Sequence, residues 1–291
     1  MIEPNVCGVV VTFRPRLEDL ENLVKLRPQV QGLVVVDNGS SGEKRTLLRS
    51  AAQQWDFTLI ENEANLGIAT ALNMGVKWAQ SKGHKWVALF DQDSTPPPGF
   101  IDTMLRAYEA SSRRDRIALI VPRYIDSRRG VPLPAIYAED GSLRAAMTSG
   151  SLIPISIISK EGWFEDQLFI DGVDSEYCLR LQSSGYSLEE CTEAFLLHTP
   201  ADFTEYRVKG FRPFWTPNYS AGRRYYRERN KVWILKKYST KFPILGRTLT
   251  DSLKDLVKIL VAESDKKKKV FHMAMGVRDG LMGRMGKTVE P

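Results

Sequence analysis

The sequence has 291 residues, of which 43% are hydrophobic and 26% are charged. These proportions are typical of a soluble globular protein and exclude a mainly disordered or collagen-like chain. Lys and Arg number 41 against 35 Asp and Glu, so the formal net charge is +6. This excess is too small to require a nucleic-acid partner, but it suits an anionic ligand or a membrane surface.

The cysteines and the apolar runs indicate a cytoplasmic protein. The three cysteines are far apart and lack the spacing of metal ligands, and their odd number argues against a disulfide scaffold. We find no signal-peptide pattern at the N-terminus, and no apolar run approaches the roughly 20 residues of a spanning helix. We therefore expect a soluble protein, or one bound peripherally to the inner face of the cell membrane.

Short apolar runs alternate with amphipathic segments in the first third of the chain. This alternation predicts βαβ units and a mostly parallel sheet, in which ligands bind beyond the carboxyl ends of the strands. The predicted strands are Val6–Thr12, Gly32–Val36, Phe57–Ile60 and Trp86–Phe90, and the predicted helices are Leu17–Leu26 and Gly67–Lys82.

Polar residues follow three of these strands. Asp37–Ser40 follows the second strand, although such residues are also common in turns and helix caps, so this segment alone does not distinguish the two. Asp91 and Asp93 follow the fourth strand, and two like charges so close repel unless a cation or hydrogen-bond donors compensate them. Carboxylate oxygens suit Mg²⁺ or Mn²⁺, which typically bridges them to substrate phosphates. The pattern therefore favours a nucleoside diphosphate site, in which Asp37 could accept hydrogen bonds from the nucleoside.

The middle third carries further acidic residues and a histidine. Leu152–Ile158 is a candidate buried strand, and Asp174 and Glu176 are typical of an acidic helix N-terminus, which complements the helix dipole. This explanation does not cover Asp171, which lies among apolar residues. Asp174 could accept a proton from a hydroxyl group. His198 could be a metal ligand, but a lone histidine after a strand is more often structural.

The last third is basic. Residues 206–237 are dense in cations and aromatics, Leu249–Val261 forms an amphipathic pattern, and four lysines, Lys266–Lys269, precede a Met-rich stretch at 270–285. This tail fits either anionic lipid or a solvated helix face, and the sequence leaves both open. We expect one domain at 1–240 and a basic helical tail at 241–291.

The ordered set of motifs resembles the inverting family-2 glycosyltransferases of GT-A fold, and among them the bacterial rhamnosyltransferases of cell-surface polysaccharide synthesis. The resemblance covers residues 5 to 240. The matching segments are Val9–Pro15, Val35–Ser40, Asn65–Gly75, Leu89–Ser94, Thr148–Ser151, Phe169–Arg180, His198 and Arg224–Asn230.

The resemblance implies a role for each motif. It implies Asp174 as the catalytic base. The residue just before this base is usually Glu in the wider family but is Val173 in this sequence. This difference narrows the subfamily that the chain resembles. The resemblance also implies Asp93 and His198 as ligands of Mg²⁺ or Mn²⁺. The implied nucleotide-binding residues are Thr12, Arg14, Asp37, Asn65, Gly67, Ala71 and Asp91. The residues implied to contact diphosphate or acceptor are Arg224, Tyr226 and Arg229.

The expected function is therefore hexosyl transfer by a metal-dependent, inverting enzyme. The expected donor is dTDP-L-rhamnose, and the expected acceptor is a lipid-linked saccharide. Alternatives are a UDP-sugar transferase that moves galactofuranose or glucose, and a non-catalytic module that binds a nucleotide or single-stranded nucleic acid. We expect no nucleic-acid partner, because the clustered carboxylates would repel a polyanion.

Overall fold

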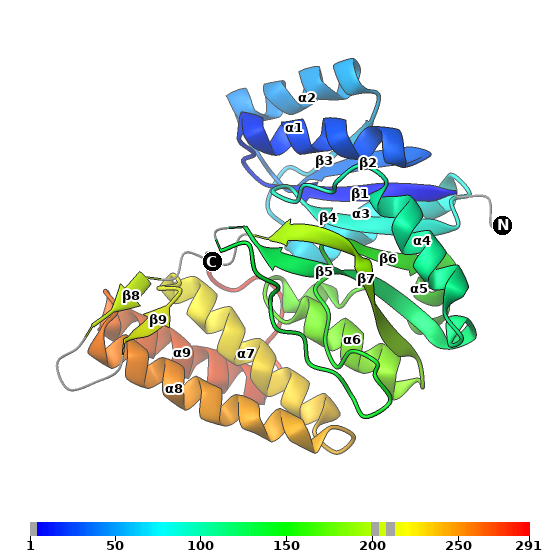
Figure 1. Ribbon diagram of the computed structural model, residues 1–291. Coiled ribbons are helices and arrows are strands. Elements are labelled where there is room, and N and C mark those ends of the chain that lie inside the picture. Colours follow the sequence, from blue (N-terminus) through cyan, green and yellow to red (C-terminus); the bar gives the residue numbers. More distant parts are fainter. Residues whose placement is uncertain (1–4, 128, 199–203, 208–212) are drawn as a thin grey trace. The chain divides into compact units, whose positions relative to one another are not determined.

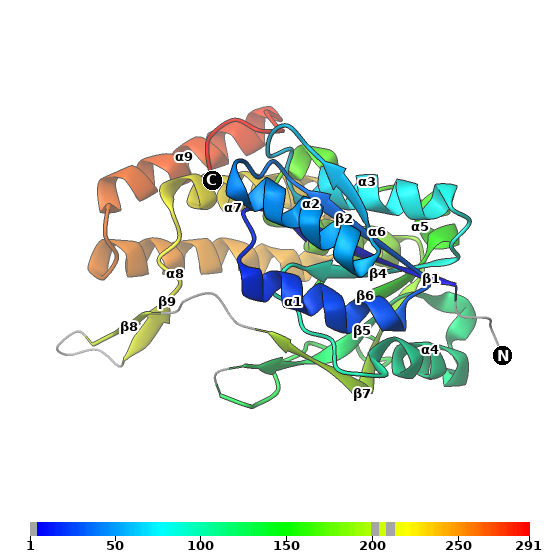
Figure 2. The same ribbon diagram turned by 90° about the horizontal axis from the view of Figure 1, so that it is seen from above.

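The computed structural model describes residues 5–127, 129–198, 204–207 and 213–291, and Figures 1 and 2 show it in two views. The chain divides into two compact units. Unit 1 comprises residues 1–165 and 174–199, and unit 2 comprises residues 166–173 and 200–291. The boundary expected at residue 240 falls within the second of these units.

Unit 1 is built on a seven-stranded mixed sheet with the strand order β3-β2-β1-β4-β6-β5-β7. β6 is antiparallel to both of its neighbours, and every other pair is parallel. The strands are β1 (Val6–Thr12), β2 (Gly32–Asp37), β3 (Thr58–Glu61), β4 (Trp86–Asp91), β5 (Ile117–Asp126), β6 (Ser151–Pro154) and β7 (Ser187–His198). The predicted α/β class with a mostly parallel sheet is confirmed.

Helices cover both faces of this sheet, as Figure 2 shows with α1 and α4 on one side and α3 and α5 on the other. Val6 and Val10 of β1 belong to the same buried cluster as α1, α2 and α4. Val9, on the opposite face, lies against Gly75 of α3. Burial on both faces explains why β1 reads as an unbroken apolar run. The helices are α1 (Leu17–Leu26), α2 (Glu43–Trp55), α3 (Ile68–Ser81), α4 (Phe100–Ala110), α5 (Ile155–Glu161) and α6 (Val173–Ser183).

The predicted elements of the first third are all present, but the strand expected at residues 152–158 is wrong in its second half. β6 ends at Pro154, and Ile155 begins the helix α5. Pro154 has no backbone N–H to donate, and it stands at the N-cap of this helix, where a missing donor is tolerated. Ile155 and Ile158 are buried at helical spacing, which a short apolar run does not distinguish from a strand.

Among its described residues, unit 2 combines a short antiparallel pair of strands with three α-helices. Gly276 and Gly280 of α9 lie directly against the backbone of α7 at Tyr225 and Arg229, where a side chain would not fit. The pair is β8 (Thr204–Tyr206) and β9 (Phe214–Thr216), and the helices are α7 (Ala221–Tyr238), α8 (Arg247–Val261) and α9 (Lys266–Met282). The predicted helical C-terminal region is confirmed, and none of the helices in the described ranges is long and apolar enough to cross a membrane.

Unit 2 also explains why Asp171 lies among apolar residues. Its carboxylate accepts hydrogen bonds from the Arg223 guanidinium at 3.1 and 3.2 Å, and its backbone carbonyl accepts one from the Asn230 side chain. Both partners lie on α7. Asp171 therefore anchors its segment to this helix, which helix-dipole complementarity did not predict.

Substitution of Gly75 tests the packing of α3 on the sheet. Alanine raises helix propensity by about 1 kcal/mol, but its methyl group would overlap the Val9 side chain, and overpacking costs about 1–3 kcal/mol. Gly75→Ala is therefore expected to lower the free energy of unfolding by about 1 kcal/mol in chemical denaturation. Val9→Ala in the same chain should recover part of this loss, whereas Gly246→Ala, where no neighbouring atom lies within 4 Å, should not destabilise. Unchanged stability of Gly75→Ala would contradict this packing.

Candidate functional site

Three of the predicted binding segments meet at one edge of the sheet. β1 lies between β2 and β4, and the three strands are parallel. Thr12 is paired with Asp37 on β2, and Val11 is paired with Asp91 on β4. The carboxyl ends of the strands therefore bring Thr12, Asp37 and Asp91 to the edge at which open α/β sheets bind ligands.

The loop after β2 is held together by its own polar side chains. Asp37 is fully buried, and its carboxylate accepts hydrogen bonds from the backbone N–H and the hydroxyl of Ser40. The Asn38 side-chain amide donates to the Asn65 side chain at 3.1 Å, and its oxygen accepts from the Leu66 N–H at 3.0 Å. Asp37 thus shapes the loop in this structure, and its contact with a base stays a prediction.

Asn65 and Gly67 form the entry to α3. The Asn65 side-chain oxygen accepts a hydrogen bond from the Gly67 N–H at 2.9 Å. Gly67 has a φ of 90°, which glycine adopts without steric cost. Ala71 follows in the first turn of α3 and is fully buried, so its side chain faces the interior. Asn65 is half-buried, whereas Gly67 and Ala71 are buried, and contact of these three residues with a nucleotide stays a prediction.

Thr12 and Arg14 offer the other polar groups at this edge. The Thr12 hydroxyl is buried and, within the described ranges, has no hydrogen-bond partner. Arg14 is exposed, and its backbone N–H donates to the Ser40 hydroxyl at 2.7 Å. An unpaired buried hydroxyl costs free energy unless a ligand or water supplies its partner. Thr12 is therefore suited to contact a polar ligand at the end of β1.

Ser149 holds the acidic segment that follows β4. Its hydroxyl accepts a hydrogen bond from the Asp91 N–H at 3.2 Å and lies 2.5 Å from the Ser94 hydroxyl. Gln92 accepts a hydrogen bond from the Phe13 N–H at 2.8 Å, which ties the segment to the end of β1. Asp93, between these anchored residues, is exposed. Its carboxylate is therefore presented to solvent on a fixed backbone.

The charges of two neighbouring carboxylates act on Asp91. Burial raises the pKa of Asp91 to about 7, and the neighbouring charges of Asp174 and Asp93 contribute to this rise. Each of these causes disfavours the ionised form of Asp91. The site therefore carries negative charge that a cation would stabilise.

Asp174 lies at the wall of a cavity of about 430 Å³ in unit 1. Tyr124 also lines this cavity and donates hydrogen bonds to the backbone carbonyls of Met147 and Ser149. Burial, followed by the charges of Asp174 and Asp91, raises the pKa of Tyr124 well above its ordinary value. Most of the remaining lining is apolar: Val121, Pro122, Leu133, Pro134, Ala135, Leu143, Ala145, Ala146 and Met147. Asp174 is therefore a carboxylate in a largely apolar cavity large enough for part of a substrate.

His198 is at the end of β7, beside the acidic segment. Leu197 forms a β-bridge with Thr95, two residues beyond Asp93. The His198 ring is 6.3 Å from the Tyr124 ring, centroid to centroid. Among the residues that the structure describes, no three His, Cys, Asp or Glu side chains could hold a metal ion together. An ion bound by Asp93 and His198 would therefore take its other ligands from substrate phosphates and water, as Mg²⁺ commonly does.

The three residues expected to contact diphosphate or acceptor have partners inside unit 2. Arg224 is buried and paired with Glu263 at 2.6 Å. The Tyr226 hydroxyl donates to the Val289 carbonyl at 2.6 Å, and the buried Arg229 guanidinium donates to backbone carbonyls, among them that of Leu168 at 2.9 Å. Arg224, Tyr226 and Arg229 therefore contribute to the packing of unit 2, and their contact with diphosphate or acceptor stays a prediction.

Sequence reasoning did not assign roles to Ser149, Tyr124 and Asn38. Ser149 and Asn38 lie within motifs that the sequence singles out, and small polar residues beside glycine at strand ends are a usable signal for loop anchoring. Tyr124 has no local signal, because its partners Met147 and Ser149 are more than 20 residues away along the chain.

Comparison with known proteins gives a family match for part of the chain. Residues 9–149 match the family model of glycosyl transferase family 2. The chain is 26% identical to the dTDP-rhamnosyl transferase RfbF of Shigella flexneri over 97% of both chains. It is 23% identical to the low-salt glycan biosynthesis hexosyltransferase Agl10 of Haloferax volcanii over 68% of both.

Solved structures share the fold. The mannosyltransferase PcManGT of Pyrobaculum calidifontis, in complex with GDP-Man and Mn²⁺, aligns with a TM-score of 0.60 at 16% identity, over 97% of this chain and 88% of that one. TarS 1-349 of S. aureus, in complex with UDP, aligns with a TM-score of 0.54 at 13% identity, over 96% and 92%. Together with the family match, this places a glycosyl transferase family 2 domain of GT-A fold at residues 9–149, and the chain is a glycosyltransferase.

Proposed function

We propose that this glycosyltransferase transfers L-rhamnose from dTDP-L-rhamnose to a hydroxyl group of a lipid-linked saccharide during cell-surface polysaccharide synthesis. The similarity to a dTDP-rhamnosyl transferase over nearly the full length of both chains supports the donor. The observation that carries the chemistry is the placement of Asp91 at the end of β4, near the charges of Asp174 and Asp93, with Asp174 at the wall of a cavity. We place the enzyme in the cytoplasm, at the inner face of the membrane.

Asp174 is the proposed catalytic base. It stands in the first turn of α6 and borders the cavity, where an acceptor hydroxyl can reach its carboxylate. Asp174 takes the hydroxyl proton while the acceptor oxygen attacks the anomeric carbon on the side opposite the diphosphate. The new carbon–oxygen bond forms as the bond to the diphosphate oxygen breaks. A β-linked L-rhamnosyl donor therefore yields an α-L-rhamnoside.

Asp93 and His198 are the proposed ligands of Mg²⁺ or Mn²⁺. The donor set fits such an ion, because the exposed Asp93 carboxylate supplies an oxygen ligand. It also lies near other carboxylates, and their like charge, which contributes to the raised pKa of Asp91, favours binding of a cation. When bound, a divalent cation neutralises the charge that develops on the departing diphosphate. The Mn²⁺ complex of a protein with the same fold supports divalent-metal use.

Thr12, Arg14, Asn65 and Gly67 are the proposed donor contacts. The unpaired Thr12 hydroxyl and the exposed Arg14 side chain lie at the end of β1, and Asn65 and Gly67 shape the loop before α3. A guanidinium can bind two phosphate oxygens at once, which suits Arg14 to the diphosphate. Gly67 allows a phosphate or ribose to approach the backbone closely.

UDP-sugar transfer is the alternative donor chemistry. Proteins of this fold were solved with UDP and with GDP-Man, so the fold accepts different nucleotides. A non-catalytic nucleic-acid module is disfavoured, because the coupled carboxylates at the strand ends would repel a polyanion.

A donor panel tests the substrate. We expect dTDP release from dTDP-L-rhamnose in the presence of Mn²⁺, and calorimetric binding of dTDP that is tighter than binding of UDP. UDP-glucose and UDP-galactofuranose should release little UDP under the same conditions. Turnover of a UDP-sugar with no turnover of dTDP-L-rhamnose would contradict rhamnosyl transfer while leaving glycosyl transfer intact.

Replacement of Asp174 tests the base. Asp174→Asn keeps the size of the side chain but removes the proton acceptor, so turnover should fall by about 10²–10⁴-fold. Calorimetric binding of dTDP should be retained, because Asp174 faces the acceptor side. Asp102→Asn, in the first turn of α4, is the matched control and should keep full activity. Full activity of Asp174→Asn would refute its assignment as base.

Metal removal tests the proposed cation. EDTA should abolish turnover, and added Mg²⁺ or Mn²⁺ should restore it. Asp93→Asn should raise the metal concentration needed for half-maximal rate by at least tenfold, because a neutral amide is a weaker ligand. Asp115 also has an exposed carboxylate and lies on η2 (Arg114–Arg116). Asp115→Asn is therefore the matched control and should behave like the unmodified chain. An EDTA-insensitive rate would remove the metal from the mechanism.

A further inference from the structure

Unit 2 exposes an apolar surface on α8. Leu249, Leu253, Val257 and Leu260 are each more than half exposed, with fractions of 60%, 62%, 53% and 53%. Their spacing of four, four and three residues places them on one side of the helix. Ile259, on another side, is fully buried. α8 is therefore held to its own unit by a different side from the one that carries the exposed leucines.

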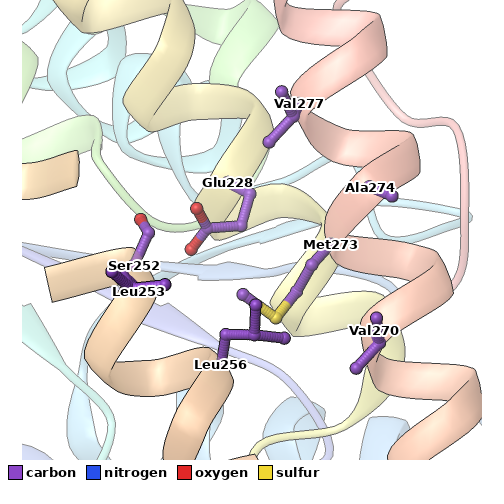
Figure 3. Close-up of a pocket in the computed structure, with 8 residues that line it drawn as sticks. All are labelled: Glu228, Ser252, Leu253, Leu256, Val270, Met273, Ala274 and Val277. Carbon is purple, nitrogen blue, oxygen red and sulfur yellow. The ribbon is translucent and has the colours of Figure 1, made fainter. Parts of the chain in front are cut away.

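The apolar surface continues across a groove to α9. Leu253 and Leu256 of α8 and Val270, Ala274 and Val277 of α9 line this groove of about 310 Å³, and Figure 3 shows the two sets on facing helices. On α9 the exposed apolar residues extend to Leu281 and Met282.

The polar residues of the groove are satisfied internally. The Glu228 carboxylate lies in the groove lining (Figure 3) and is paired with Lys231 at 2.9 Å. Lys231 also donates to the Ser252 hydroxyl at 2.9 Å. The groove therefore offers hydrocarbon to an occupant and no free charge.

Lysines border this surface. The exposed Lys254 and the half-buried Lys258 each follow an apolar residue of α8, roughly a quarter turn further around the helix. Three lysines at the start of α9, those at 266–268, are exposed. Lys269, the fourth residue of the run, is instead buried and paired with Glu263 at 2.8 Å. The structure thus divides the lysine run into three exposed cations and one internal ion pair.

We propose that this face, formed by the exposed leucines and valines of α8 and α9 and the lysines beside them, binds the surface of an anionic lipid bilayer. A helix with leucines on one side and lysines at its borders inserts its apolar side at the headgroup level. The lysine stems extend along the apolar surface, and their ammonium groups reach the anionic headgroups.

Charge favours a bilayer over a second copy of the chain as the occupant. Two copies that paired through this face would bring their bordering lysines together, and like charges at an interface disfavour association. An anionic bilayer instead offers both hydrocarbon for the leucines and opposite charge for the lysines. The role of this surface rests on the proposed function, because a lipid-linked acceptor would be presented at the same bilayer.

Vesicle flotation of the full chain, without donor or acceptor, tests the surface separately from catalysis. The chain should float with vesicles that contain phosphatidylglycerol and should remain unbound with pure phosphatidylcholine vesicles. Leu253→Gln with Val257→Gln should weaken binding at least tenfold. The matched control, Leu17→Gln with Val24→Gln, changes two exposed apolar residues of α1 in unit 1 and should leave binding unchanged.

A second pair of variants tests the charge. Lys267→Gln with Lys268→Gln should weaken binding roughly 25-fold, and Lys25→Gln with Lys85→Gln, also exposed, should have little effect. All four double variants should keep dTDP binding. The proposal is overturned if the chain does not float with anionic vesicles, or if the α8 and α9 variants float as well as their controls. Light scattering that shows a dimer dissociated by Leu253→Gln with Val257→Gln would also overturn it, in favour of a second copy.

Discussion

The crowding of like charges at the carboxyl edge of the sheet is the constraint that governs unit 1. Asp91 is the half-buried last residue of β4, where burial raises the pKa of its carboxyl group and the charges of Asp174 and Asp93 add to this rise. A fold that needed only stability would not collect these groups, because the charges of Asp93 and Asp174 disfavour ionisation of Asp91. Their collection makes sense where a cation and a diphosphate complete the site, as in the proposed sugar transfer.

The architecture of unit 1 could be predicted because the apolar pattern of each strand agrees with the place of that strand in the sheet. β1 and β4 are apolar on both faces, and the polar residues at their carboxyl ends indicate the binding edge from the sequence alone. α5 was missed because residues 152–158 are too short an apolar run to separate a strand from a helix. Tyr124 was missed because its hydrogen bonds join residues distant in the sequence.

The cation-rich segment of α7 has internal partners that residue type alone does not reveal. Arginine among tyrosines is a common composition for anion binding, but Arg224 and Arg229 are buried against partners supplied by later parts of the chain and by the segment before α6. Glu263 is 39 residues from Arg224 and Leu168 is 61 residues from Arg229, so no local pattern reveals these partners. The lysines of α9 divide in the same way, since Lys269 has an acidic partner and its neighbours in the run are exposed.

Ser149 gives unit 1 one further property. Its hydroxyl engages the Asp91 backbone, and its carbonyl accepts the Tyr124 hydroxyl, which borders the cavity. One residue thus links the end of β4, which carries Asp91, to the cavity that Asp174 borders. A ligand that shifts Ser149 on one side would therefore change the affinity for a ligand on the other side. Thermodynamic linkage then requires that the second ligand change the affinity for the first by the same factor.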